Sequence, residues 1–160
     1  EHATWGALVV HTLRHGRHGW ASHAPLRTWS PRSAELLSRA KALGENAAPS
    51  WFPDSGLVHT DLHTDNVLID NDGISGIIDW EDACLGDHRY DLVQFAFDLD
   101  GHNQPVWHIV DDAGIEPRVI RAYAALLVLK CTSAAIRHYP QDVPRQLARA
   151  ERVFNRYGLW

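Results

Sequence analysis

The chain has 160 residues, of which 45% are apolar and 22% charged, and its formal net charge is −5. This is the size of one globular domain, and its two cysteines, which lack a CxxC spacing, exclude a disulfide scaffold or a cysteine-based zinc module. No unbroken apolar run approaches the ~20 residues of a membrane span, and no charged-then-apolar leader opens the chain. We therefore expect a soluble, cytoplasmic protein with no membrane partner.

The first third of the sequence predicts two helices and two loops. Apolar residues recur at helical spacing over 4–15. The basic, His-rich stretch 17–28 is expected to be a loop. A Ser-Pro pair then favours the start of a helix over 31–43, and Gly44 favours its end. A second loop is expected over 45–56.

The middle of the sequence predicts a small β-structure. Short β-prone runs occupy 57–58, 66–69 and 74–80, and Asn-Asp-Gly at 71–73 is typical of a hairpin turn between the last two. Helical periodicity then returns and predicts helices over 90–99, 106–113, 117–138 and 144–156. The expected fold class is α+β, mainly helical, with one β-hairpin.

Charge is strongly segregated along the chain. Residues 54–116 contain 15 of the 20 acidic residues and only one of the 15 Lys and Arg residues, namely Arg89. Such a segment repels a phosphate backbone, so we expect no nucleic-acid partner. It favours divalent cations or a cationic ligand, although a merely solvated acidic face remains an alternative.

The same segment carries the candidate chemistry. Asp61 lies in the loop between two predicted strands, Asn66 begins the outgoing strand of the hairpin, and Asp79 ends the returning strand. Hairpin pairing should place Asn66 and Asp79 opposite each other. A carboxylate and an amide oxygen are suitable ligands for Mg²⁺, which leaves Asp61 to accept the proton of a substrate hydroxyl.

Three motifs now support a resemblance to a known family. They are HTDLHTDN at 59–66, IDWE at 78–81 and GDHRYDL at 86–92, all within 34 residues. In order and spacing they resemble the aminoglycoside phosphotransferase family and its choline-kinase-like relatives, which share the protein-kinase-like fold. The resemblance covers the C-terminal lobe of that fold.

The resemblance implies a role for seven residues: Asp61 as the catalytic aspartate, His59 shaping the catalytic loop, Asn66 and Asp79 holding Mg²⁺, Asp91 bracing the loop, and Glu81 and Asp82 facing the substrate. It also implies ATP or GTP as the phosphate donor and a small-molecule hydroxyl as the acceptor. The acidic segment favours an amine-bearing acceptor, such as an aminoglycoside or another basic antibiotic, and hence a part in antibiotic resistance. One departure is Thr60, where the family commonly has glycine.

A larger departure concerns the nucleotide lobe. The family has an N-terminal lobe with a phosphate-binding lysine, whereas the two lysines here, Lys41 and Lys130, both fall in predicted helices. We therefore expect 1–160 to be one C-terminal-lobe domain, with its N-terminal nucleotide lobe missing. We expect this domain to have three parts: a helical lead-in at 1–56, the catalytic loop and hairpin at 57–82, and a helical substrate-side subdomain at 83–160.

The chain begins with Glu1 and contains no methionine, which favours a piece of a longer kinase. Because such a piece lacks the phosphate-binding lysine and the covering loop of the missing lobe, we expect negligible transfer activity from it alone. Three alternatives stay open. The chain is a natural ligand-binding remnant without turnover, or a separate chain supplies the other lobe. Alternatively, the alternation of His59, Asp61, His63 and Asp65 belongs to a zinc hydrolase.

Overall fold

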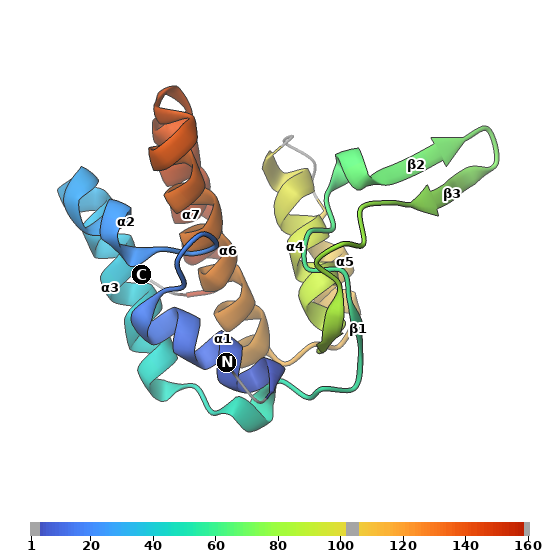
Figure 1. Cartoon of the computed structure of the whole chain (residues 1–160), viewed down its shortest axis with the longest axis horizontal. Coiled ribbons are helices and arrows are strands. Elements are labelled where there is room, and N and C mark those ends of the chain that lie inside the picture. The colour runs from blue at the N-terminus through green and yellow to red at the C-terminus, as the bar shows by residue number, and fades with distance from the viewer. Residues whose placement is uncertain (1–3, 102–105, 159–160) are drawn as a thin grey trace.

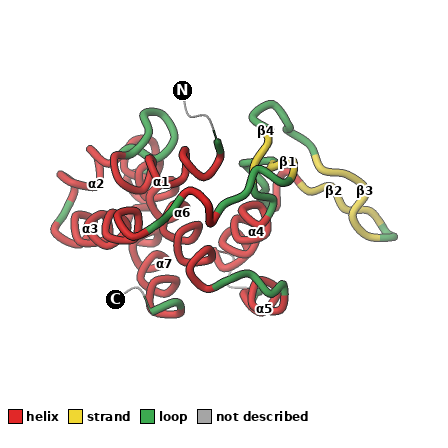
Figure 2. Tube along the Cα trace, turned by 90° about the horizontal axis from the view of Figure 1, so that it is seen from below, coloured by secondary structure: helices red, strands yellow, loops and turns green. Residues whose placement is uncertain are grey.

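The computed structural model describes residues 4–101 and 106–158. They form a helical body from which one β-hairpin projects (Figure 1). Helix α6 (Pro117–His138) runs through this body, as the view in Figure 2 also shows. Helices that pack against α6 come from before and after it in the chain: α1 (Trp5–His15), α2 (His23–Trp29), α3 (Pro31–Asn46), α4 (Arg89–Gly101) and α7 (Val143–Arg156).

Helix α6 has the bounds that the sequence predicts. Pro117 occupies its first turn, where a missing N–H costs nothing, and its Ala- and Leu-rich centre is buried. By length and composition α6 is long and apolar enough to cross a membrane, although polar residues interrupt its apolar sequence. Because 72% of its most apolar window is buried within the described fold, it has the character of a core helix.

Helices α1 and α3 pack against each other, and both begin with side-chain caps. Thr4 accepts a hydrogen bond from the backbone of Ala7, and Ser30 and Ser33 form a capping box. The prediction that Gly44 ends the second helix is wrong, because α3 continues to Asn46. A Cβ at Gly44 would lie 2.8 Å from the Cβ of Leu13, so this glycine permits close helix packing.

The prediction of a loop over 17–28 is wrong in its second half, where α2 begins at His23. Pro25 lies in the first turn of α2, so it does not interrupt the hydrogen bonds of the helix. His23 and Leu26 are buried, and α2 packs on α3 and α6. Tertiary packing therefore stabilises a helix that is too short to give a clear sequence pattern.

Two antiparallel strand pairs lie within the acidic segment 54–116. Strand β2 (Val67–Asp70) pairs with β3 (Gly73–Ile77) in the predicted hairpin, and Gly73 takes a φ of 123° in its turn. The returning strand ends at Ile77, earlier than predicted. Strand β1 (Gly56–Val58) pairs with β4 (Cys84–Gly86), a strand that the sequence did not predict. This second pair holds the two ends of 59–83 together.

Helices α4, α5 (Trp107–Asp112) and α7 lie where the sequence predicts helices, with ends shifted by a few residues at most. The mainly helical α+β class is confirmed. Both cysteines are free and half-buried, so no disulfide contributes to the fold.

Candidate active site

The loop 59–66 is held along its length by one face of α4. Asp91, Gln94 and Asp98 are three, four and seven positions apart, so they project from the same side of the helix. Asp91 accepts hydrogen bonds from the backbone N–H of His59 (2.7 Å) and of Thr60 (3.1 Å). Burial raises the pKa of Asp91, although these two N–H groups act in the opposite direction.

The far end of the loop has a second anchor on α4. The carboxylate of Asp98 accepts hydrogen bonds from the backbone N–H and the hydroxyl of Thr64, both at 2.9 Å. Thr64 opens a 3₁₀ turn that ends at Asn66 and leads into β2. Asp91 and Asp98 thus fix both ends of the loop relative to one rigid helix.

The ring of His59 links this loop to the segment that follows β3. The side chain is buried, and its Nε2 donates to the carbonyl oxygen of Ile78 at 2.8 Å. Its Nδ1 accepts from the backbone N–H of Asp61 at 3.3 Å, so the two ring nitrogens have different roles. Because both ring nitrogens are engaged, His59 has none left for a zinc ion, which argues against the hydrolase alternative.

Asp61 lies in the middle of the braced loop and pairs with a lysine from α6. Lys130 Nζ is 2.8 Å from Asp61 Oδ1 and 3.2 Å from the carbonyl oxygen of Thr60. Gln94 donates to the same carboxylate at 3.3 Å, and His63 Nε2 lies 3.6 Å from its other oxygen. Burial raises the pKa of Asp61, but Lys130, His63 and Gln94 together outweigh that effect, so the pKa lies below its ordinary value.

Two residues beside this centre adopt a left-handed backbone. The φ angle is 69° at Thr60 and 66° at Asp79, and these are the two described non-glycine residues with positive φ. All the polar groups of Thr60 are engaged: Asp91 accepts from its N–H, Lys130 donates to its carbonyl oxygen, and its hydroxyl donates to the carbonyl oxygen of Asp82 at 3.3 Å. Strain of this kind concentrates at functional sites.

Asn66 and Asp79 lie at the same end of the hairpin. Val67 pairs with Ile77, and the N–H of Ile78 donates to the carbonyl oxygen of Asn66 at 3.0 Å. The amide nitrogen of Asn66 donates to the carbonyl oxygen of Asp61, so the amide oxygen is the atom free to bind a cation. An amide oxygen and an exposed carboxylate fit Mg²⁺ chemically. Among the described residues, three or more His, Cys, Asp or Glu side chains nowhere gather as a metal site.

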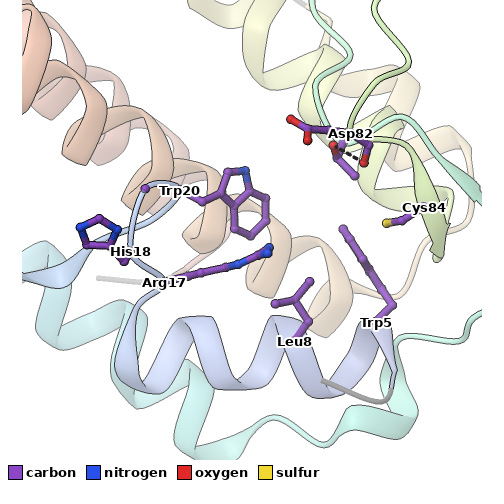
Figure 3. A pocket seen from close by; sticks show the side chains of 9 residues that line it. Trp5, Leu8, Arg17, His18, Trp20, Asp82 and Cys84 are labelled. Carbon is purple, nitrogen blue, oxygen red and sulfur yellow. Dashed lines mark hydrogen bonds between the residues drawn. The ribbon is translucent and has the colours of Figure 1, made fainter. Parts of the chain in front are cut away.

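Neither of the two predicted substrate residues lines the pocket that Asp61 lines. Glu81 is exposed in the turn 80–83, where the N–H of Ala83 donates to the carbonyl oxygen of Trp80. Asp82 lines an open pocket of about 440 Å³. In Figure 3, Arg17 and Trp20 from the N-terminal segment lie across this pocket from Asp82.

A second, smaller pocket lies beside Asp61. Its volume is about 130 Å³, and the Asp61 carboxylate is part of its wall. The remaining lining residues come from the loop and from three helices: His63, Gln94, Phe97, Asp98, Leu127, Lys130, Cys131 and Arg149. This pocket therefore combines the candidate catalytic aspartate with charged groups from α4, α6 and α7.

A buried network sets the start of α4. Asp87 is fully buried and accepts hydrogen bonds from Arg89 and, at 2.7 Å, from the Tyr123 hydroxyl. The Tyr123 hydroxyl in turn accepts from the indole N–H of Trp5 at 3.0 Å. This network joins α1, α4 and α6, and so it fixes the direction in which α4 presents Asp91.

Comparison with known proteins identifies the family. The model of the phosphotransferase enzyme family matches residues 10–129. The chain belongs to this family. The resemblance inferred from the three motifs is thus confirmed, and no solved structure matches at a significant level.

Several kinases are similar to this phosphotransferase chain. A homoserine kinase of Methylobacterium nodulans is 36% identical over 118 residues, which are 68% of this chain and 35% of that protein. A homoserine kinase of Neisseria meningitidis serogroup B is 45% identical over 60 residues, 38% of this chain and 19% of the relative. A hygromycin-B 4-O-kinase of Escherichia coli is 44% identical over 73 residues, 43% of this chain and 21% of the relative. The matches span about a third or less of these relatives.

Sequence reasoning missed several contacts of this phosphotransferase chain. The sequence predicts a helix around Lys130 but no role for this residue. Its contact with Asp61 joins residues 69 positions apart, so no local pattern reveals it. Gln94 and Asp98 share the spacing of Asp91 on α4, which is the signal that could have found them. Nothing in the sequence distinguishes Arg149, which lines the small pocket, from the exposed arginines of α7.

Proposed function

We propose that this chain is the catalytic lobe of a kinase that transfers the terminal phosphate of ATP or GTP to a hydroxyl of a small molecule. The observation that carries the proposal is the arrangement of Asp61. A phosphotransferase-family loop holds this carboxylate between Lys130 and Gln94, at the wall of a pocket of about 130 Å³. A nucleotide donor also favours a cytoplasmic location.

Asp61 orients the attacking hydroxyl and receives its proton. The hydroxyl oxygen forms a bond to the terminal phosphorus, the bond to the bridging oxygen breaks, and the nucleoside diphosphate leaves. The lowered pKa of Asp61 keeps the side chain ionised at neutral pH, and Lys130 fixes the orientation of the carboxylate. Asn66 and Asp79 would hold Mg²⁺, which when bound supplies charge neutralisation at the phosphates.

We further propose that a nucleotide lobe packs on the β2–β3 hairpin. The hairpin leaves large apolar side chains exposed, including Ile69 (73%) and Ile74 (68%). A two-stranded hairpin is only marginally stable in water by itself, so this apolar surface suits a covering lobe. The phosphate-binding lysine of the family would belong to that lobe.

The relatives offer two kinds of acceptor for this site, namely homoserine and an aminoglycoside. The expectation of an amine-bearing acceptor rested on the acidic segment, but several of its carboxylates are used within the fold. These carboxylates bind backbone N–H groups, Trp107 or arginines: Asp54, Asp87, Asp91, Asp98, Asp100 and Asp111. The acidic charge therefore supports a cationic acceptor only weakly.

The test is phosphate transfer by the protein as its gene encodes it, with L-homoserine, hygromycin B and other small alcohols as acceptors. We expect one acceptor to become phosphorylated, and Asp61→Asn to lower the rate by about 10²–10⁴-fold. Asp65→Asn is the matched control, because its carboxylate lies in the same loop with 93% of the side chain exposed. An Asp61→Asn protein with the wild-type rate would refute the role of Asp61. Binding of ATP and an acceptor without transfer would favour the ligand-binding alternative.

A further inference from the structure

Arg149 differs from the other arginines of α7. Arg145, Arg152 and Arg156 are exposed at the side chain and pair with aspartates. Arg149 is only 7% exposed, and its guanidinium carbon lies 3.8 Å from the centre of the Phe97 ring. Among the described residues, neither its Nε nor its Nη2 has a hydrogen-bond partner.

An unpaired buried guanidinium is costly for the fold. Burial lowers the pKa of Arg149, because loss of hydration disfavours the charged form. Buried cations normally have a hydrogen-bonded partner, and those that lack one need an explanation. Nε and Nη2 form one edge of the guanidinium, and such an edge binds a carboxylate through two parallel hydrogen bonds.

The acidic and basic side chains around Arg149 have hydrogen-bond partners other than Arg149. Asp98, which lines the same pocket, already binds the N–H and hydroxyl of Thr64. Asp100 accepts from Trp107 and Arg152. Lys130, the other Lys or Arg residue in that wall, is paired with Asp61.

The small pocket joins Arg149 to the reaction centre. Arg149 and Asp61 both line its volume of about 130 Å³, which equals about four waters at ~30 Å³ each. That room suits a compact molecule with a few non-hydrogen atoms. The carboxylates of Asp61 and Asp98 in the same wall disfavour a doubly charged phosphate, whereas an ammonium group beside Asp98 is compatible with them.

We propose that Arg149 binds the carboxylate of the phosphate acceptor, which makes the acceptor a small hydroxy acid or hydroxy amino acid. This inference rests on the proposed kinase function. The Nε/Nη2 edge of Arg149 is closed to solvent, so it turns towards the pocket to bind the carboxylate, and the hydroxyl of the same molecule lies at Asp61. The arrangement distinguishes amino-acid-like alcohols from aminoglycosides, which carry no carboxylate.

The experiment compares L-homoserine with 2-amino-1,4-butanediol, in which an alcohol replaces the carboxylate. Binding is measured by calorimetry and transfer by release of nucleoside diphosphate, on the protein as its gene encodes it. We expect Arg149→Met to weaken L-homoserine binding and to raise its KM by about 10–100-fold, the range for hydrogen bonds to a charged group. Binding of the diol should stay unchanged, and Arg149→Lys should give an intermediate loss.

Arg152→Met is the matched control, because Arg152 lies one turn further along α7 and is 54% exposed at the side chain. Thermal unfolding separates a binding role from a structural one. Removing an unpaired buried charge while keeping an apolar stem should leave the melting temperature unchanged or raise it. A large fall in melting temperature for both Arg149→Met and Arg149→Lys would overturn the inference in favour of a structural role.

Three further results would overturn the inference: equal binding of acid and diol by the wild type, equal weakening of both by Arg149→Met, or a rise confined to the KM of the nucleotide. Failure of the proposed function has a different signature. If Arg149→Met abolishes carboxylate-selective binding but no acceptor is phosphorylated, the carboxylate site stands and the kinase proposal fails.

Discussion

Replacing Thr60 by glycine should stabilise the protein. Thr60 has a φ of 69°, and a left-handed conformation costs a residue with a Cβ about 1–2 kcal/mol. Glycine avoids this cost but loses about 0.5–1 kcal/mol through the greater freedom of the unfolded chain. The contacts of Thr60 with Asp91 and Lys130 use its backbone, so they survive the substitution.

The hydroxyl is the one polar contact that Thr60→Gly removes, and its bond to the carbonyl oxygen of Asp82 is long at 3.3 Å. The balance is a gain of about 0.5–1 kcal/mol, which corresponds to a rise of about 2–3 °C in melting temperature for a domain of this size. Differential scanning calorimetry of Thr60→Gly, Thr60→Ala and Thr60→Val separates the contributions. Valine keeps the branched Cβ without the hydroxyl, and alanine keeps an unbranched Cβ.

We expect the glycine variant to have the highest melting temperature and the valine variant the lowest. If Thr60→Gly melts at or below Thr60→Ala, the backbone at this position is not strained, and the reasoning is refuted. Equal melting temperatures for valine and threonine would show that the hydroxyl contributes nothing.

Two more predictions concern ionisable groups. Lys130→Met should raise the pKa of Asp61, because the substitution removes the hydrogen bond and charge that lower it. The acid limb of the pH profile of kcat/KM should therefore move to higher pH, and an unmoved limb would contradict the pairing. Burial lowers the pKa of His23 to about 4 from 6.5. The unfolded chain therefore binds a proton at a higher pH than the folded one, and this favours unfolding as the pH falls from 6.5 towards 4. By pH 4.5 the loss from His23 should reach about 2 kcal/mol. Urea unfolding of wild type and His23→Gln across this range should show a steeper decline in the wild type; parallel curves would exclude this effect.

The sequence predicts those parts of the fold whose signals are local. The bounds of α6 follow from Pro117 and a long apolar pattern, and the β2–β3 hairpin follows from Asn-Asp-Gly at 71–73. The loop 59–66, the candidate catalytic loop, is recognisable because Asp61 and Asn66 have a characteristic spacing. These features need only neighbouring residues, so the order of the chain is enough to find them.

Other parts of the fold depend on distant residues and left no local signal. Strand β4 has three residues and exists because it pairs with β1 across the intervening loop. Lys130 reaches Asp61 only after α6 packs beside α4, and Arg149 is distinguished from its neighbours only by burial. The packing of helices determines these positions, so neither a hydrophobic repeat nor a sequence motif can reveal them.

The way α4 holds the loop 59–66 also restricts where the chain can change in length. The turn at 71–73 is exposed at the tip of the hairpin, so residues added there would leave both anchors in place (Figure 1). A single residue inserted between Asp91 and Asp98 would rotate one anchor about 100° away from the other. The loop would then lose its support at one end, although every residue that contacts it would still be present.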